Sequence, residues 1–149
     1  MKKTLTFGVI VALMITLASC SNSTSTPSNT YTFKGTSYTA SIVVASNSSL
    51  QVSNYSSSSV ILVFTSFPTT SGTYQVATGT APTNANQVAV NFANLTTSAT
   101  YAGAPSGIVN ATVTVASNGK ITVIIPAVTL AGVGNSSDTG PFTANLTQQ

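Results

Sequence analysis

The sequence predicts an all-β domain, a single antiparallel β-sandwich or barrel of about 8–10 short strands. Apolar and polar residues alternate with a period of two through nearly every segment after residue 31, and the apolar positions are mainly β-branched or aromatic. Clusters of Gly, Pro, Asn and Ser separate these segments, and no segment carries the 3.6-residue apolar stripe of a helix. The apolar positions of the alternation are Tyr31 and Phe33; Tyr38, Ala40, Ile42 and Val44; Leu50 and Val52; Tyr74 and Val76; Val88, Val90 and Phe92; Val109, Ala111, Val113 and Val115; Phe142, Ala144 and Leu146.

The length of the chain suits one domain with a single core. Because turn-forming residues mark the connections between strands, we expect six of them along the chain. They are residues 46–49, 55–58, 68–72, 79–86, 105–107 and 132–140.

Two segments are almost continuously apolar and depart from the alternation: Val60–Phe64 and Ile121–Ile125. Such runs are typical of central strands covered on both faces, or of barrel strands whose outer face meets another element. Pro126 follows the second run and lacks a backbone N–H, so we expect it to end or bulge that strand.

The sequence around Asn118-Gly119 predicts a β-hairpin whose register can be argued. A two-residue loop would place Val115 opposite Thr122 and would mix polar and apolar residues on each face. A three-residue loop, with Gly119 left-handed in a G1 bulge, places Val115 opposite Ile121 and makes one face wholly apolar. A slip of one residue moves every side chain to the other face, so the pattern favours the three-residue loop. This register also sets Val113 opposite Val123 and Thr114 opposite Thr122.

The N-terminus has the pattern of a secretory signal. Lys2 and Lys3 precede an apolar run over residues 5–17, which is too short for a stable membrane span. The run ends in Leu17-Ala18-Ser19-Cys20, which resembles the lipobox of bacterial lipoproteins, in which the cysteine is acylated and the chain is cut just before it. The resemblance implies a signal peptide over residues 1–19 and lipidation at Cys20. We then expect residues 20–30 to form a Ser/Thr-rich flexible tether and residues 31–149 to form the all-β domain.

Charged side chains are almost absent. From Cys20 onward the chain has only Lys34, Lys120 and Asp138, and its surface must be neutral and rich in hydroxyl groups. Two lysines without an arginine cannot neutralise a run of phosphates, so we exclude nucleic acid as a partner. Cys20 is the only cysteine, and the core must therefore hold without disulfides.

The sequence offers almost nothing for catalysis, and we expect no enzyme, no catalytic residue, no cofactor and no metal site. The chain has no histidine, glutamate, arginine or tryptophan, which removes most general acids, bases and transition-metal ligands. Asp138-Thr139-Gly140 matches the triplet of aspartic proteases, but a single copy would need a second carboxylate from a dimer. The triplet is better explained by turn chemistry.

Tyrosines are the remaining candidates for recognition, since each combines an apolar ring with a hydroxyl. Tyr38 and Tyr74 lie in phase with apolar positions, which favours burial. Tyr55 lies out of phase and Tyr101 lies beside a Gly-Ala-Pro loop, so these two are the possible ligand contacts.

The order of features in the domain resembles small all-β lipoproteins of Bacteroidota-type bacteria. The resemblance rests on Phe33–Ala40, on Ser71–Tyr74 and on the Asn118-Gly119-Lys120 hairpin followed by Ile-Pro. It covers most of the domain and implies a β-sandwich or barrel at the cell envelope, without assigning functional residues. The acidic run that often follows the acylated cysteine in surface-exported members is absent, which favours an outer-membrane anchor facing the periplasm.

Three functions follow as hypotheses. The leading one is a membrane-anchored, non-catalytic binding or scaffolding module whose ligand is an unidentified protein or glycan. The alternative is a structural or adhesive surface component, because exposed strand edges can pair with other chains. An enzyme is the remote alternative.

Overall fold

The computed structural model describes residues 29–149, and within this range it contains eleven strands and no helix. The prediction of an all-β fold is confirmed, with slightly more strands than the 8–10 expected. The predicted signal peptide and Cys20 lie outside the described residues. The strands are β1 (Thr30–Phe33), β2 (Thr36–Thr39), β3 (Ile42–Ser46), β4 (Ser49–Ser53), β5 (Ser58–Phe64), β6 (Gly72–Val76), β7 (Gln87–Asn94), β8 (Ala99–Gly103), β9 (Asn110–Val115), β10 (Ile121–Gly132) and β11 (Asn135–Thr147).

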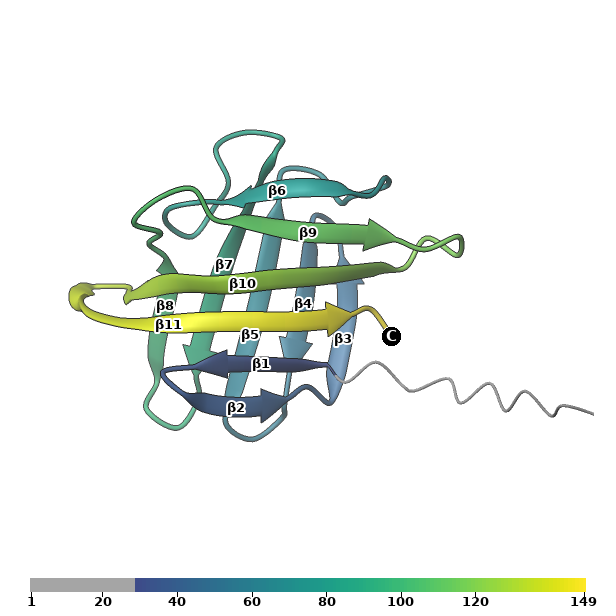
Figure 1. The fold of residues 1–149 in the computed structure, drawn as a ribbon. Helices are drawn as coiled ribbons and strands as arrows, with labels where there is room; N and C mark the ends of the chain where they lie inside the picture. Colours follow the sequence, from purple (N-terminus) through teal and green to yellow (C-terminus); the bar gives the residue numbers. More distant parts are fainter. Residues whose placement is uncertain (1–28) are drawn as a thin grey trace, which may run out of the picture.

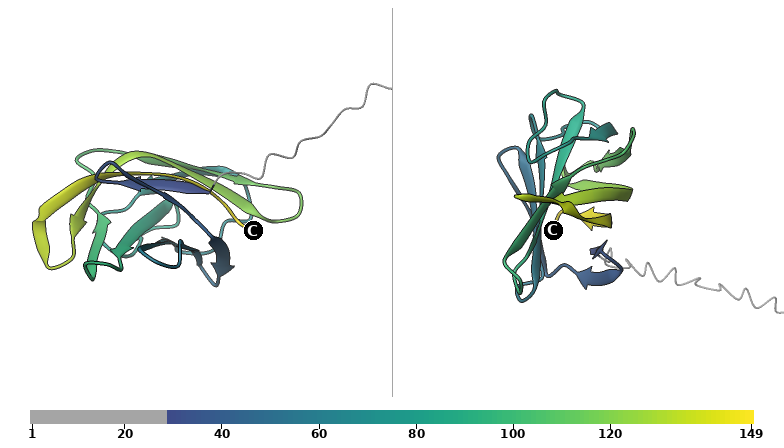
Figure 2. Two further views of the ribbon diagram at one scale, coloured as in Figure 1. Left: turned by 90° about the horizontal axis from the view of Figure 1, so that it is seen from below. Right: turned by 90° about the vertical axis from the view of Figure 1, so that its left-hand side faces the viewer.

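The strands form two layers that cross at a steep angle (Figure 1). One layer, called the front layer here, has the order β2-β1-β11-β10-β9-β6, and the back layer has the order β8-β7-β5-β4-β3. The two layers are joined where β6 pairs with β7 in parallel and where β8 pairs with β10. Figure 2 shows the layers facing each other, the arrangement of an orthogonal sandwich. The sheet path ends at β2 and β3, so the sheet is not a closed barrel.

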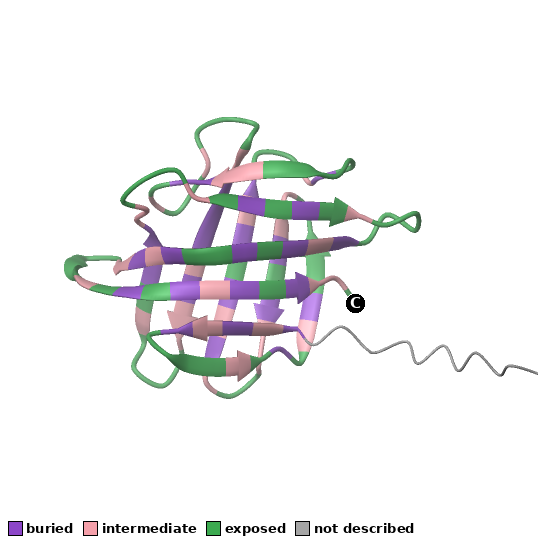
Figure 3. Ribbon diagram, in the orientation of Figure 1, coloured by how far each residue is buried: buried purple, intermediate pink, exposed green. Residues whose placement is uncertain are grey.

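The core lies between the layers, and most strands show a buried residue at every second position (Figure 3). Aromatic rings fill its centre: the ring centroids of Phe33 and Phe92 are 4.5 Å apart, and those of Tyr31 and Phe142 are 6.4 Å apart. The hydroxyl of Tyr31, on β1, shares a hydrogen bond of 2.7 Å with Oγ of Ser58, on β5. Since both residues are almost fully buried, this bond connects the two layers inside the core.

The predicted register of the β9–β10 hairpin is confirmed. Val115 lies opposite Ile121, Thr114 opposite Thr122 and Val113 opposite Val123. The amide of Gly119 donates to the carbonyl of Ala116 at 2.9 Å, and Gly119 has a φ of 79°. A type I turn followed by a left-handed glycine is the three-residue loop that the apolar pattern favoured.

The two continuous apolar runs do form central strands, but the expectation of cover on both faces is wrong. β5 lies between β4 and β7, and β10 lies between β9 and β11. Their outward side chains face solvent: Ile61 is 39% exposed and Ile124 is 47% exposed. Because the molecule has only two layers, no element covers the outer face of either. Pro126 does bulge β10, since the register shifts between Ile125 and Val128.

The side chains of β3 take the opposite phase from the one predicted. The alternation placed Ile42 and Val44 on the core face together with Tyr38 and Ala40. In the structure Val43 is fully buried, while Val44 is 42% exposed. The reason is that the chain passes from the front layer to the back layer between β2 and β3, and this crossing breaks the alternation. β3 therefore presents aliphatic side chains outward.

The predicted connection over residues 132–140 is also wrong. β10 continues to Gly132 and β11 begins at Asn135, so the turn contains only Val133 and Gly134. Gly134 has a φ of 88°, which suits a tight hairpin turn. Ala131 pairs with Thr139 and Gly132 with Asn135, so residues 136–138 form a bulge in β11.

The folded part begins slightly before residue 31. Asn29 is buried and its Oδ1 accepts a hydrogen bond from the amide of Thr147, while Thr30 is already in β1. The expected tether over residues 20–30 thus overlaps the domain by two residues. Within residues 29–149 there is no helix of the length and hydropathy needed to cross a membrane.

Candidate binding site

The outer face of the back layer can be read from its register, because residues directly opposite each other in a sheet share a face. Val44 lies opposite Gln51, Gln51 opposite Ile61, and Ile61 opposite Asn91. A second row across the same strands contains Ile42, Ser53, Ser59, Ala93 and Thr100. The face therefore alternates aliphatic groups with hydroxyls and side-chain amides.

Three adjoining grooves lie along this face. The first, of about 390 Å³, crosses β3, β4 and β5; the second, of about 280 Å³, crosses β5, β7 and β8 and shares Ser59 and Ile61 with it. The third, of about 380 Å³, runs on to the tip of β10 and shares Thr80 and Val133 with the second. We call these three grooves together the uncharged track.

The lining of the track contains no Asp, Glu, Lys or Arg. Its exposed aliphatic side chains are Val44, Ile61 and Val133, with exposed fractions of 42%, 39% and 55%. Several hydroxyls and side-chain amides lie among them. The side-chain amide of Asn91 donates a hydrogen bond to the backbone carbonyl of Thr80 at 3.0 Å. Such a surface favours a ligand that has apolar faces and hydrogen-bonding groups but no charge.

Tyr101 lines the second groove, but it is buried, so a ligand in that groove would reach little of its ring. It lies opposite Phe92 on the core face of β8, and its ring centroid is 4.5 Å from that of Phe33. Only its hydroxyl reaches a polar neighbourhood, where it donates to Oδ2 of Asp138 at 2.7 Å. The position of Tyr101 in the register, which the sequence pattern did not reveal, decides its burial.

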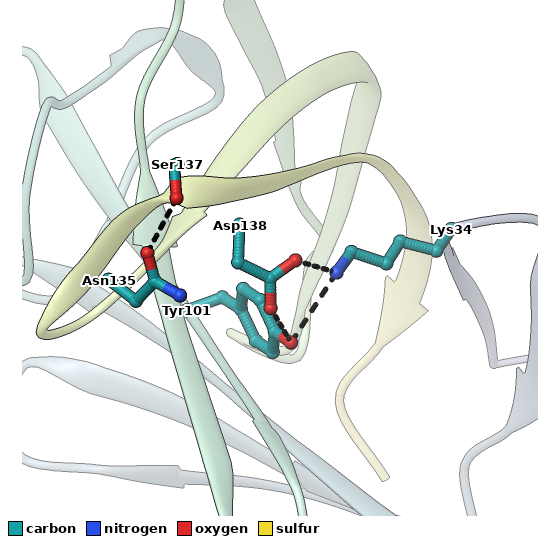
Figure 4. Close-up of polar contacts among 5 residues, drawn as sticks. All are labelled: Lys34, Tyr101, Asn135, Ser137 and Asp138. Carbon is teal, nitrogen blue, oxygen red and sulfur yellow. Dashed lines mark hydrogen bonds and ion pairs between the residues drawn. The ribbon is translucent and has the colours of Figure 1, made fainter.

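Lys34, Tyr101 and Asp138 meet in one polar cluster (Figure 4). Nζ of Lys34 forms an ion pair with Oδ1 of Asp138 and lies 3.5 Å from the hydroxyl of Tyr101. The ammonium group also lies 4.8 Å from the centroid of the Tyr101 ring, within the range of a cation–π contact. Both charged side chains are more than a third exposed, so the cluster is solvated and its contribution to stability is small.

The cluster perturbs the titration of all three groups. The hydrogen bond from Lys34, and then that from Tyr101, lowers the pKa of the Asp138 carboxyl. The same carboxylate is the main reason why the pKa of Lys34 is raised. It also raises the pKa of the Tyr101 phenol, since it accepts a hydrogen bond from the protonated phenol and disfavours a second negative charge nearby.

Backbone geometry brings these residues together from distant parts of the sequence. Lys34 has a φ of 49° in the tight turn between β1 and β2, and Asp138 is the last residue of the β11 bulge. Ser137, also in the bulge, donates to Oδ1 of Asn135 at 2.7 Å (Figure 4). The alkyl chain of Lys34 lies against Gly140, where an added methyl would overlap Cγ of the lysine. A glycine at position 140 is thus what lets Lys34 reach Asp138.

Tyr55 is exposed as expected, with 69% of its surface accessible, and it is held in an unusual conformation. Its φ is 63°, a left-handed value that costs a non-glycine residue about 1–2 kcal/mol. Oδ1 of Asn54 accepts hydrogen bonds from the amides of Ser57 and Ser58 at 3.1 and 2.9 Å. The amide of Tyr55 donates to Oγ of Ser53, a track-lining residue, at 3.0 Å. These bonds fix the loop and hold the backbone of Tyr55 beside Ser53, which lines the track.

Asp138, the sole carboxylate side chain in the sequence, is engaged by Lys34 and Tyr101. In the described part of the chain, no three His, Cys, Asp or Glu side chains gather as a metal site would require. Tyr38 and Tyr74 are half-buried and pack against the core, close to the prediction.

The chain was compared with family models, with curated proteins and with solved structures, and none of these comparisons gives a match.

Proposed function

We propose that this protein is a lipid-anchored component of the bacterial cell envelope that binds an elongated, uncharged ligand along the track without transforming it. The proposed anchor is Cys20, lipidated within the lipobox Leu17-Ala18-Ser19-Cys20. The proposed location is the outer membrane, with the domain facing the periplasm. The uncharged track on the outer face of the back layer is the observation that carries the binding role.

The apolar runs of the sequence support this role. β3 and β5 are apolar on both faces, although a two-layer sandwich buries only one face of each strand. The core does not require aliphatic residues at Val44 and Ile61, because both side chains lie on the outer face of the back layer and are partly exposed. Aliphatic groups gathered on one exposed face are typical of a surface that is covered by a partner.

A pair of matched substitutions tests the proposal. Ile61→Lys places a charge in the middle of the track, whereas Ile124→Lys places one at a comparably exposed position on the outer face of the front layer. The full chain, in detergent, is screened against soluble glycans and uncharged peptides. We expect any ligand found to lose binding with Ile61→Lys and to keep it with Ile124→Lys. Equal binding by both variants would show that the track is not the site.

A structural or adhesive role is the second candidate, and the edge strand β2 supports it. β2 ends the front layer and carries neither a charged residue nor a proline, two of the usual protections against edge pairing. β3 ends the back layer, but its edge is partly covered, since the amide of Gln149 donates to the carbonyl of Val43. This role predicts concentration-dependent assembly and removal of the domain by protease added to intact cells. A monomer protected in intact cells favours the binding module instead.

A further inference from the structure

We infer that the ligand of the uncharged track is a neutral polysaccharide and that Tyr55 provides the platform on which one of its sugar rings stacks. This inference rests on the proposed binding function and names the chemical class of the ligand. It is drawn from the chemistry of the lining, the direction of the track across the strands and the bond between the backbone of exposed Tyr55 and track-lining Ser53.

The chemistry of the lining matches that of a neutral sugar chain. A pyranose ring has apolar C–H faces and hydroxyls around its rim, and these hydroxyls both donate and accept hydrogen bonds. Val44, Ile61 and Val133 offer surfaces for the C–H faces. Serine, threonine, asparagine and glutamine side chains beside them offer groups that likewise donate and accept. An acidic polysaccharide would meet no cation in the lining, so the absence of charge favours a neutral one.

The direction of the track also favours a sugar chain over a peptide. The track runs across the strands, from β3 to β8, over four strand separations of about 4.8 Å each, roughly 19 Å in all. Over this distance the backbone groups of the strands are engaged in the sheet, so the face presents only side chains. A peptide is usually bound at a strand edge, where it gains main-chain hydrogen bonds. A lipid chain would need a closed apolar cavity, whereas this track is open and partly polar.

The track itself offers no exposed aromatic ring, because the two aromatic residues that line it, Phe92 and Tyr101, are buried and turned to the core. Tyr55, next to the track in the β4–β5 loop, would supply that ring. Tyr55 is highly exposed, and its backbone amide is bound to the side chain of track-lining Ser53. Leu95, which is 50% exposed, joins the same edge, since its amide donates to the carbonyl of Ser57 at 2.8 Å. The hydrogen bonds of Asn54 fix the Tyr55 loop before any ligand arrives, which reduces the entropy lost on stacking.

The test uses the full chain in detergent and neutral hexasaccharides of glucose, mannose, xylose and N-acetylglucosamine, measured by isothermal titration. A hexasaccharide of galacturonic acid is the anionic control, and a Ser/Thr/Gly peptide of similar length is the peptide control. We expect at least one neutral sugar to bind, with the two controls inactive. Tyr55→Ala should weaken binding by at least about tenfold and Tyr55→Phe by less than about threefold, because the ring and not the hydroxyl makes the contact. Ile108→Ala, at an exposed residue that lines none of the three grooves, should leave binding unchanged.

The outcomes separate this inference from the function on which it rests. If the peptide binds, Ile61→Lys abolishes that binding and no sugar binds, the track is a binding site but the polysaccharide class is wrong. If a sugar binds and Tyr55→Ala has no effect, the platform role of Tyr55 is wrong. If neither sugar nor peptide binds, both proposals fail.

Discussion

The buried hydrogen bond between Tyr31 and Ser58 should give a measurable coupling free energy in a double-mutant cycle of unfolding. Tyr31→Phe removes the phenolic oxygen and leaves the hydroxyl of Ser58 without its 2.7 Å partner in a fully buried position. An unsatisfied buried polar group costs about 1–3 kcal/mol. Ser58→Ala leaves the hydroxyl of Tyr31 only a long contact of 3.4 Å to the Ser58 carbonyl, so we expect a loss near the lower end of that range.

The double variant Tyr31→Phe/Ser58→Ala removes both polar groups and leaves an apolar contact of nearly the same shape. It should therefore be more stable than the sum of the single losses predicts, by about 1–2 kcal/mol. The measurement is the free energy of unfolding from urea titration of all four proteins, followed by the far-ultraviolet circular dichroism of the sheet.

The matched control is a second pair of hydroxyls that joins neighbouring strands of one layer. Thr32 on β1 and Thr143 on β11 share a hydrogen bond of 2.8 Å, but both are partly exposed, so water can replace either partner. The same cycle with valine at these positions should give a coupling below about 0.5 kcal/mol. If the effects of the single substitutions at Tyr31 and Ser58 add within about 0.5 kcal/mol, the two side chains are not energetically coupled and their bond does not connect the layers.

Three further predictions concern other parts of the chain. Gly119→Ala should lower the free energy of unfolding in urea by about 1–2 kcal/mol, because alanine disfavours a φ of 79°. An added methyl would meet no neighbouring atom, so the backbone strain alone sets this loss. Ser117→Ala in the same turn is the control and should change the free energy little. Asp138 has a lowered pKa, so its ion pair with Lys34 stabilises the fold above about pH 4 and is lost as the pH falls through the folded-state pKa. The raised pKa of Lys34 keeps the pair intact up to about pH 10, and Asp138→Asn should remove the acid-side dependence of the urea midpoint; an unchanged dependence would contradict the assignment. Cys20→Ala should move the protein from the membrane fraction to the soluble fraction, and a wild-type protein found wholly in the aqueous phase after detergent partitioning would contradict the lipobox interpretation.

Local patterns in the sequence were enough to predict those features that depend on neighbouring residues. The β9–β10 register followed from two strands that each have one apolar face, together with a turn that demands a left-handed glycine. The bulge at Pro126 followed from its missing N–H. In both cases the physical cause lies within about ten residues along the chain.

Features that depend on the crossing of the layers could not be predicted in this way. The alternation cannot tell that Ile42 and Val44 point outward, because the phase of β3 is set by the passage from one layer to the other. The burial of Tyr101 depends on pairing between β8 and β7, and β8 is too rich in Ala, Gly and Thr to stand out as a strand. Lys34 and Asp138 are 104 positions apart, and a bulge in an unexpectedly long hairpin brings them together.

The pairing of Lys34 with Asp138 leaves the domain with a single uncompensated side-chain charge among residues 29–149, that of Lys120. Lys120 directly precedes β10, whose first residue, Ile121, accepts a hydrogen bond at its carbonyl from the amide of Gln148. The neighbouring Thr147 donates to the side chain of Asn29, the first described residue. The positive charge therefore lies at the end of the front layer where the described chain begins, opposite the β10–β11 tip (Figure 1). Under the proposed anchoring through Cys20, this is the end of the described domain to which the anchor connects, and one lysine close to an anionic membrane surface gains about 1 kcal/mol. This attraction is too weak to hold the protein on a membrane, but under that proposal it favours an orientation with Lys120 toward the lipid headgroups and the Val133 end of the track away from them.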